Sequence, residues 1–474
     1  MKNIKQIIEQ SGIKFGTSGA RGLVTDFTPE VCTAFTHSFL DAMQKRFEFK
    51  RVAVAMDNRP SSPEIAAIVC GAIEAYGFEV DFYGVLPTPA LALQAMRDTT
   101  PSIMITGSHI PFDRNGIKFY RPDGEISKED ESEIINNSNQ IKLAKAHLPE
   151  VKENAAVNYM NRYANFFGDK CLSGLKIGIY EHSSAGRDLY ANLFTTLGAE
   201  VISLGRSNEF VPIDTEAVAD IDKKRAKEWV KEYGFDAIFS TDGDGDRPLI
   251  ADENGDWLRG DIVGLLTAQY LGVEALAVPV SCNTAIEKSG FFKEVLRTRI
   301  GSPYVIEAFD TLQAYNSFAG FEANGGFLLG STLMQDTKRL DALSTRDALL
   351  PFIVLASCVV KEQVPLSKLT QSLPQRFTSS DRIQEFPREK SIKLLKKGAS
   401  NPEALLKSLG VEDVKVLDTN TIDGLRLTLN NKVIIHLRPS GNAPELRCYV
   451  ETDSQDFSDN LVTQVLSSVG QIIL

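Results

Sequence analysis

The stretch that decides the fold is residues 52–83, VAVAMDNRPSSPEIAAIVCGAIEAYGFEVDFY. It begins with a short apolar run at 52–55 and continues through a polar loop into an amphipathic segment over 63–76. A second apolar run at 79–83 follows Gly77. Strand-length apolar runs on either side of a helical pattern are typical of a βαβ unit. The sequence therefore predicts an α/β domain around this stretch.

The same order of patterns occurs twice more along the chain. One copy joins apolar runs at 175–180 and 199–204 through an amphipathic helix. The other joins runs at 275–280 and 295–297 through a weaker helix that contains Gly290. We therefore expect three similar α/β domains of about 110–150 residues each. The alternative is coincidence, because any long α/β protein contains such units.

The last part of the chain follows a different pattern. Apolar residues predict strands at 425–429, 433–437 and 446–450, and an amphipathic helix over 461–469. Strands joined by short turns pair in an antiparallel sheet, so we expect a C-terminal α+β domain. The whole chain then divides into three α/β domains and this last one, with limits at 1–153, 154–257, 258–370 and 371–474.

Composition and charge narrow the classes of function. The 474 residues are 43% hydrophobic and 24% charged, as in a typical globular protein. The net charge is −11 and no dense basic run occurs, so we exclude nucleic-acid binding. The first ten residues lack the apolar core of a signal peptide, and no run approaches the roughly 18 apolar residues of a membrane span. We therefore expect a cytoplasmic protein that does not bind membranes.

A serine lies in a polar loop directly after the apolar run 102–105. The loop reads TGSHIP, with Ser108 next to His109 and ten residues before Lys118. A serine on a turn at a strand end, near a histidine and a lysine, is a candidate nucleophile with acid–base partners. The loop is not the G-x-S-x-G elbow of hydrolases, because Ile110 occupies the position of the second glycine.

Three carboxylates alternate with glycines after the apolar run 237–240. They are Asp242, Asp244 and Asp246 in the sequence DGDGD. At about 5 Å and an effective dielectric near 20, each like-charge pair costs roughly 3 kcal/mol, so we expect a bound cation. Oxygen ligands without His or Cys select Mg²⁺ or Ca²⁺. An EF-hand is excluded, because Arg247 occupies the position of its required glycine and a strand precedes the loop.

Two glycine-rich loops add groups that suit a sugar phosphate. Glycines surround Arg21 in FGTSGARG, residues 15–22, so a ligand can approach the backbone there. Glu322 and Asn324 lie in GFEANGG, residues 320–326, and both side chains can bond to hydroxyl groups. A plain structural turn is the alternative for each loop.

A fifth loop links two strands of the C-terminal domain. It reads RPSGNAPELR over residues 438–447, with an arginine at each end of a Ser-Gly-Asn turn. Arginine forks, a hydroxyl and free backbone N–H groups together can hold a phosphate. The alternative is a surface hairpin whose arginines have no such task. Taken together, the five loops indicate phosphoryl transfer on a phosphorylated sugar.

These five loops, in this order and at these intervals, resemble those of the α-D-phosphohexomutase superfamily, above all the bacterial phosphomannomutases and phosphoglucomutases. The usual loops of that family read TASHNP, DGDGDR, GExSG and RPSGTEP. This chain departs from them at Gly107, Ile110, Asn324 and Asn442-Ala443. The resemblance covers essentially the whole chain. It implies three similar α/β/α domains and a smaller fourth domain around a central cleft.

The resemblance also implies a role for each matching residue. Mg²⁺ and the phosphoryl group are held by Ser108, Asp242, Asp244 and Asp246. Catalysis is served by Ser108, Lys118, Arg21, His109 and Arg247, with Lys118 as the proton shuttle. Substrate hydroxyls and the non-reacting phosphate are bound by Glu322, Asn324, Arg438, Ser440, Gly441, Asn442 and Arg447.

The implied activity is the interconversion of hexose 1-phosphate and hexose 6-phosphate. A phosphoserine enzyme forms a hexose 1,6-bisphosphate, which turns end for end and returns the other phosphate. We expect mannose phosphate as substrate, with glucose phosphate second. Phosphoglucosamine mutase is an alternative, and a non-catalytic phosphosugar-binding protein would not need Ser108. The expected partners are small hexose phosphates, and we expect a monomer or a homodimer.

Overall fold

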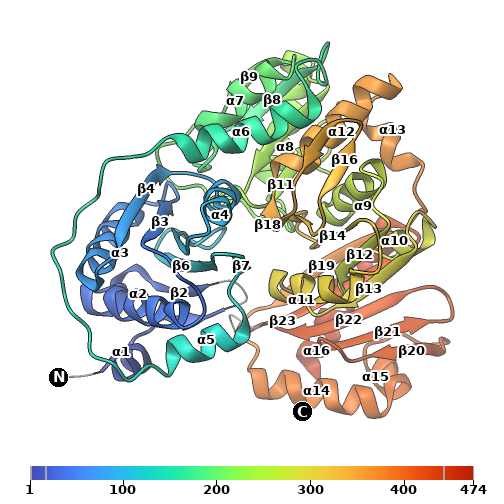
Figure 1. The fold of residues 1–474 in the computed structure, drawn as a ribbon. Coiled ribbons are helices and arrows are strands. Elements are labelled where there is room, and N and C mark those ends of the chain that lie inside the picture. The colour runs from blue at the N-terminus through green and yellow to red at the C-terminus, as the bar shows by residue number, and fades with distance from the viewer. Residues whose placement is uncertain (1–2, 17–18, 441–443, 473–474) are drawn as a thin grey trace.

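The structure is a computed structural model that describes residues 3–16, 19–440 and 444–472. Four units form an arc in Figure 1: a blue N-terminal unit, a green one above it, a third in yellow and orange, and a red C-terminal one. A segment at residues 136–153 runs along the outer side of the first unit and leads into the second (Figure 1). None of the helices in the described ranges is long and apolar enough to cross a bilayer.

The first unit surrounds a mixed sheet of seven strands. Its elements in chain order are α1 (Ile4–Gln10), β1 (Lys14–Phe15), β2 (Ala20–Leu23), a 3₁₀ turn (Val24–Asp26), α2 (Pro29–Gln44), β3 (Arg51–Met56), α3 (Ser62–Tyr76), β4 (Glu79–Val85), α4 (Thr88–Arg97), β5 (Ser102–Ile105), β6 (Arg114–Arg121), β7 (Gly124–Glu125) and α5 (Lys128–Ile135). β3, α3 and β4 are the predicted βαβ unit, and the two strands are parallel.

The second and third units each surround a sheet of the same design. The second contains α6 (Asn154–Phe167), β8 (Lys176–Tyr180), α7 (Arg187–Thr196), β9 (Glu200–Leu204), α8 (Asp220–Tyr233), β10 (Ala237–Thr241) and β11 (Pro248–Ala251). The third contains α9 (Gly260–Tyr270), β12 (Ala275–Pro279), α10 (Ala285–Lys288), β13 (Glu294–Thr298), α11 (Ser302–Leu312), β14 (Phe318–Phe321), β15 (Phe327–Leu329), β16 (Leu333–Gln335), β17 (Lys338–Leu340), β18 (Leu343–Asp347), α12 (Leu349–Glu362) and α13 (Leu366–Gln371).

The three α/β sheets repeat one strand order. The order is β4-β3-β5-β6 in the first, β9-β8-β10-β11 in the second and β13-β12-β14-β15 in the third. In each sheet the first three strands are parallel and the fourth is antiparallel to its neighbour. The expected repetition is therefore confirmed. The serine, aspartate and sugar loops all join the third strand of this order to the fourth, so the three repeats place them at equivalent positions.

One expectation about the third repeat is wrong. The predicted helix containing Gly290 is a single turn, α10, which ends at Lys288. Gly290 lies beyond it with a φ of +69°, a left-handed conformation that does not continue an α-helix.

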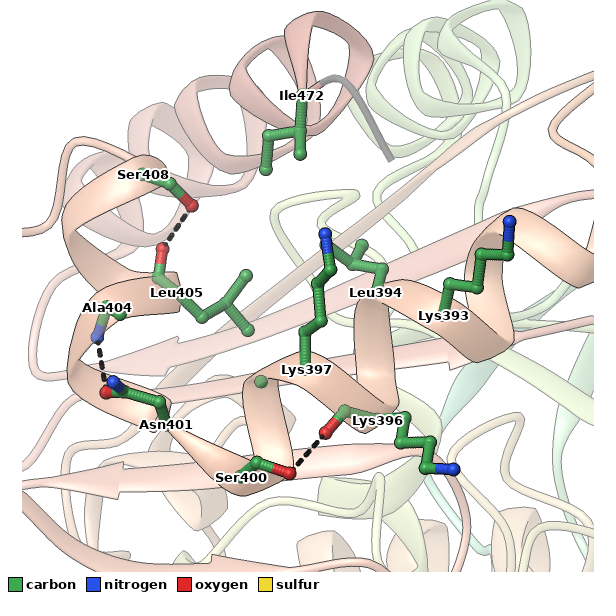
Figure 2. Close-up of a pocket in the computed structure, with 11 residues that line it drawn as sticks. Lys393, Leu394, Lys396, Lys397, Ser400, Asn401, Ala404, Leu405, Ser408 and Ile472 are labelled. Carbon is green, nitrogen blue, oxygen red and sulfur yellow. Dashed lines mark hydrogen bonds between the residues drawn. The ribbon is translucent and has the colours of Figure 1, made fainter.

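The C-terminal unit has an antiparallel sheet of five strands, as expected. Its elements are β19 (Phe377–Ile383), α14 (Arg388–Ser400), α15 (Pro402–Ser408), β20 (Val416–Asn420), β21 (Leu425–Leu429), β22 (Ile434–Pro439), β23 (Leu446–Thr452) and α16 (Gln455–Gln471). A hollow of about 580 Å³ lies between α14, α15 and the end of α16, where Leu405 and Ile472 point into it (Figure 2). Its lining includes none of the predicted site residues.

The first three units share a hydrophobic core, and the fourth unit has a separate one. One continuous core contains Met104 of the first unit, Phe239 of the second and Phe321 of the third. Phe352 of α12 lies 4.7 Å from Phe239, ring centre to ring centre, and so packs the third unit onto the second. The C-terminal unit has a hydrophobic core of its own. The three α/β units therefore share one close-packed core beneath their loops.

Candidate active site

Three of the predicted loops meet where the α/β units join. Ser108 of the first unit donates a hydrogen bond from Oγ to Asp242 Oδ2 of the second, at 2.6 Å. Arg346, on β18 of the third unit, donates to Asp246 Oδ2 at 2.8 Å and to Glu322 Oε2 at 2.9 Å. The structure thus brings the serine, aspartate and sugar loops into one buried cluster of polar side chains.

Ser108 is held in an uncommon backbone conformation. Its φ is +57°, in the left-handed region that non-glycine residues rarely adopt and that is concentrated at functional sites. Its backbone N–H donates to Thr106 Oγ1 at 2.8 Å, which fixes the turn. The hydroxyl lies 3.4 Å from Nδ1 of His109 and is buried. The turn therefore aims Ser108 Oγ at the aspartate loop.

A glycine lets the aspartate loop approach the serine loop. A Cβ placed on Gly243 would lie 2.7 Å from the carbonyl oxygen of Ser108. Backbone atoms cannot yield to that contact, so a side chain at this position would push the two loops apart. The alternation of glycine with aspartate in the sequence thus has a steric reason here.

The three aspartates are buried and surrounded by cations. Lys118 Nζ donates to Asp244 Oδ2 at 2.5 Å and to Asp246 Oδ2 at 2.8 Å. Burial, and then repulsion from the other two aspartates, raises the pKa of Asp242 well above its usual range. Burial acts in the same direction on Asp246, but Arg346 and Lys118 outweigh it and lower the pKa of that carboxyl. Protein cations therefore supply part of the neutralising charge that the sequence led us to expect.

The donor set still fits a divalent cation. One carboxylate oxygen from each of Asp242, Asp244 and Asp246 lies within 4.8 Å of the others. Oδ1 of Asp244 and Oδ1 of Asp246 have no hydrogen-bond partner among the described residues, although both are buried. Unpartnered hard oxygens in a buried cluster are the ligands that Mg²⁺ or Ca²⁺ selects.

Positive side chains cover the other side of Ser108. Arg247 Nη1 donates to Nδ1 of His109 at 2.8 Å. Burial, and then repulsion from Arg247 and Arg21, lowers the pKa of His109 well below its usual value, so the imidazole is neutral at pH 7. Burial and the same Arg247 lower the pKa of Arg21 to about 10, which leaves it charged. Two arginines thus act on His109, the neighbour of Ser108, and positive charge in this position can favour a phosphoryl group.

Glu322 lies in the cluster and Asn324 lies two residues farther along the same loop, and part of the hydrogen-bonding capacity of each is already used. Glu322 accepts from Arg346, as described above. Asn324 Oδ1 accepts from the backbone N–H of Gly326 at 3.0 Å, and its carbonyl oxygen accepts from Thr215 Oγ1 at 2.8 Å. These contacts use part of the hydrogen-bonding capacity of both side chains and help to set the shape of the loop.

The fifth loop presents a pair of arginines from the C-terminal unit. Arg438 and Arg447 are direct partners on β22 and β23. Arg438 Nε donates to Asp423 Oδ1 at 2.9 Å, whereas Arg447 Nε has no hydrogen-bond partner within the described ranges. Ser440 is buried, and its N–H donates to the carbonyl oxygen of Glu445. The predicted contacts of Gly441 and Asn442 lie outside the described residues.

Arg346 is a site residue that the sequence did not reveal. It is fully buried, and its charge is matched by Asp246 and Glu322. No sequence motif points to Arg346, because its neighbours in the short strand, Thr345 and Asp347, form no recognisable pattern with it. The antiparallel pairing of β18 with β15 brings it to the cluster, and such pairing is a tertiary contact that local sequence does not encode.

Family models match all four units. Models described as phosphoglucomutase/phosphomannomutase alpha/beta/alpha domains I, II and III match residues 12–145, 158–255 and 259–377, and the model of the C-terminal domain matches residues 389–467. Together they account for most of the chain. The order of the four models is the order of the four units.

Relatives in sequence extend over the full length. A phosphomannomutase of Salmonella muenchen is 55% identical over 99% of this chain and 98% of its own. One of Sinorhizobium fredii (strain NBRC 101917 / NGR234) is 43% identical over 96% and 98%. A phosphoglucosamine mutase of Thermodesulfovibrio yellowstonii is 28% identical over 97% and 99%. The fold and the matches define an enzyme of the mutase class, an isomerase. The chain belongs to the phosphoglucomutase/phosphomannomutase family.

Solved structures share the fold at low sequence identity. A phosphoglucomutase/phosphomannomutase family protein from Burkholderia thailandensis has a TM-score of 0.73 and 18% identity, covering 99% of this chain and 98% of its own. The Aspergillus fumigatus N-acetylphosphoglucosamine mutase, solved in complex with GlcNAc-6P and magnesium, has a TM-score of 0.59 and 14% identity, covering 98% of both chains.

Proposed function

We propose that this chain interconverts hexose 1-phosphate and hexose 6-phosphate through a phosphorylated Ser108, with mannose phosphate as its preferred substrate. The observation that carries the proposal is the 2.6 Å hydrogen bond between Ser108 Oγ and Asp242, made by a serine in a left-handed turn. The 55% identity to a phosphomannomutase supports the choice of sugar. Glucose phosphate shares the hydroxyls that Glu322 and Asn324 would bind, so it is the second substrate.

In the proposed reaction, the bond between Ser108 Oγ and phosphorus breaks as the free hydroxyl of a hexose monophosphate bonds to that phosphorus. Arg21 and Arg247 stabilise the transferring group. Lys118 shuttles the proton: its ammonium protonates the departing Ser108 Oγ, and the neutral amine that results accepts the proton of the attacking hydroxyl. The product, a hexose 1,6-bisphosphate, turns end for end, and its other phosphate returns to Ser108.

The positive charge of the proposed contact residues supports the proposal that the bisphosphate intermediate stays bound. A bisphosphate carries roughly −4 near pH 7. The proposed contacts supply five positive charges within a chain of net charge −11, namely Arg21, Lys118, Arg247, Arg438 and Arg447. Asp242, Asp244 and Asp246 are proposed to hold Mg²⁺, which when bound offsets the charge of the phosphorylated serine.

A coupled assay with mannose 1-phosphate, glucose 1-phosphate and glucosamine 1-phosphate tests the proposal. The protein receives Mg²⁺ and a catalytic amount of glucose 1,6-bisphosphate. We expect kcat/KM to fall in the order mannose, glucose, glucosamine. A clear preference for the amino sugar contradicts the substrate assignment, and binding without turnover of any sugar indicates a phosphosugar-binding protein instead.

A further inference from the structure

A buried arginine holds the backbone of the serine loop. Arg59 lies in the loop between β3 and α3 and is only 1% exposed. Its Nη2 donates to the carbonyl oxygens of Ser108 at 2.8 Å and Ile110 at 2.6 Å. Its Nη1 donates to those of Pro111 at 2.7 Å and Arg114 at 3.0 Å. One guanidinium thus satisfies four carbonyls of the loop that carries the serine.

The side chain of Arg59 is held in place by residues of the first unit and by a residue of the second unit. Its Nε donates to Asp57 Oδ2 at 3.2 Å. Asp57 also accepts from Ser62 Oγ at 2.6 Å and from Thr106 Oγ1 at 2.7 Å, and Thr106 holds the N–H of the serine. The ring of Phe210, from the second unit, stacks on the guanidinium with its centre 3.9 Å from Cζ. A guanidinium placed in this way has little freedom to move.

Gly107 leaves the room that this arginine needs. A Cβ at that position would lie 2.7 Å from Cζ of Arg59 and 2.8 Å from its Nε. An alanine would therefore displace a guanidinium that makes four loop contacts. This explains why the loop reads T-G-S here, where the resemblance led us to expect T-A-S.

We propose that Arg59 is a positioning residue for phosphoryl transfer. By holding the carbonyls from Ser108 to Arg114, it keeps the serine in its left-handed turn and its Oγ directed at Asp242. It touches no reacting atom and acts through the loop backbone alone. The inference rests on the proposed function, because it assigns a partner to the serine of that reaction.

Arg59→Ala and Gly107→Ala test the proposal by separate routes. A misplacement of about 1 Å at a reacting group can cost about 100-fold in rate, so we expect kcat for mannose 1-phosphate to fall on that scale in both variants. KM should change less than about threefold, because Arg438 and Arg447 are untouched. Arg59→Lys keeps the charge but reaches fewer carbonyls, and should regain part of the rate.

Arg46→Ala is the matched control, since Arg46 pairs with Glu133 on the outer side of the same unit. Hydrogen exchange of the peptide covering residues 106–114 provides a second readout, and we expect it to be faster in both test variants. If Arg59→Ala fails to fold, Gly107→Ala carries the test alone. An unchanged kcat, with or without faster exchange, overturns the proposal, as does an effect on KM alone. A wild-type protein without turnover overturns the proposed function as well.

Discussion

Several charged residues of the cluster have a partner of opposite charge or a hydrogen-bond donor in a buried place. Asp246 is paired with Lys118 and Arg346, and Asp242 accepts from the serine hydroxyl. Motif spacing predicted the aspartates and the serine, which lie in short loops next to strands, and Lys118, which follows the serine by ten residues and lies on β6. Arg346 and Arg59 could not be predicted in this way, since their contacts depend on how distant strands and loops pack.

Removing one carboxylate of the aspartate loop should abolish turnover, and added Mg²⁺ should not restore it. Asp244 offers an unpartnered, buried Oδ1, so we expect chelation to stop turnover of the wild type and added Mg²⁺ to restore it. Asp244→Ala should stay inactive at any Mg²⁺ concentration. Asp459→Ala, an exposed position on α16, is the control. Full activity in excess chelator would contradict a catalytic ion.

Removing Arg447 should weaken substrate binding. Its buried Nε has no hydrogen-bond partner among the described residues, and we propose that its guanidinium binds the phosphate. A charge-assisted contact is worth roughly 1.5–3 kcal/mol, which corresponds to an increase in KM of about tenfold to 100-fold in Arg447→Ala. Arg438→Ala should act in the same direction, and Arg388→Ala, exposed on α14, should change nothing. Unchanged KM values in both test variants place the phosphate site elsewhere.

At the scale of elements, apolar periodicity located most of the strands that position the site. The run at 102–105 is β5, and the run at 237–240 became β10, each followed by its functional loop. The weaker helix near Gly290 was wrong because a glycine with positive φ ends it. The short hairpin of β16 and β17 was not predicted, because strands of three residues are too short to show an alternation of apolar and polar residues.

β22 carries a buried histidine that makes stability depend on pH. His436 Nε2 donates to the carbonyl oxygen of Asp423, and burial lowers the pKa of this imidazole to about 4. An unfolded histidine has a pKa of about 6.5. The pKa is lower in the folded chain than in the unfolded chain. The contribution of His436 to the free energy of unfolding is therefore fully present above pH 6.5 and is lost as the pH falls toward 4.

Urea unfolding at pH 7.5 and pH 5.5 measures this effect. Between pH 7.5 and pH 5.5 the histidine of the unfolded chain binds a proton, whereas His436 in the folded chain stays neutral. This difference lowers the free energy of unfolding by about 1.3 kcal/mol. We expect the free energy of unfolding to fall by about 1.3 kcal/mol less in His436→Gln than in the wild type when the pH is lowered from 7.5 to 5.5. His147→Gln, at an exposed histidine, is the control. Equal pH dependence in wild type and His436→Gln contradicts a neutral His436.

At the scale of the whole molecule, the site is assembled from one support and one separately packed unit. The three α/β units share a hydrophobic core, whereas the C-terminal unit has its own and meets the third through polar contacts such as Asn283 Nδ2 to the carbonyl oxygen of Arg376. Repetition of a βαβ pattern predicted the three related sheets. It could not predict their common core, which depends on side chains that are buried only after the units pack. The domain limits at residues 153, 257 and 370 stay predictions.

The order of the loops along the chain follows from this architecture. Three repeats of one strand order bring Ser108, the aspartates and the loop of Glu322 to equivalent positions, and the fourth unit carries the arginine pair Arg438 and Arg447. Reaction at alternate ends of a bisphosphate needs a transfer site and a separate holding site. We propose that the three α/β units supply the first and the C-terminal unit the second.

Locating the phosphoryl group by mass is the most direct test of the central claim. Wild type and Ser108→Ala are treated with glucose 1,6-bisphosphate and Mg²⁺, freed of sugar, and analysed as intact protein and as peptides. We predict one added phosphoryl group on Ser108 of the wild type, none on the variant, and loss of mutase turnover in a variant that keeps its fold. A phosphoryl group on Thr106 or His109, or a Ser108→Ala variant that turns over at the wild-type rate, would contradict the account.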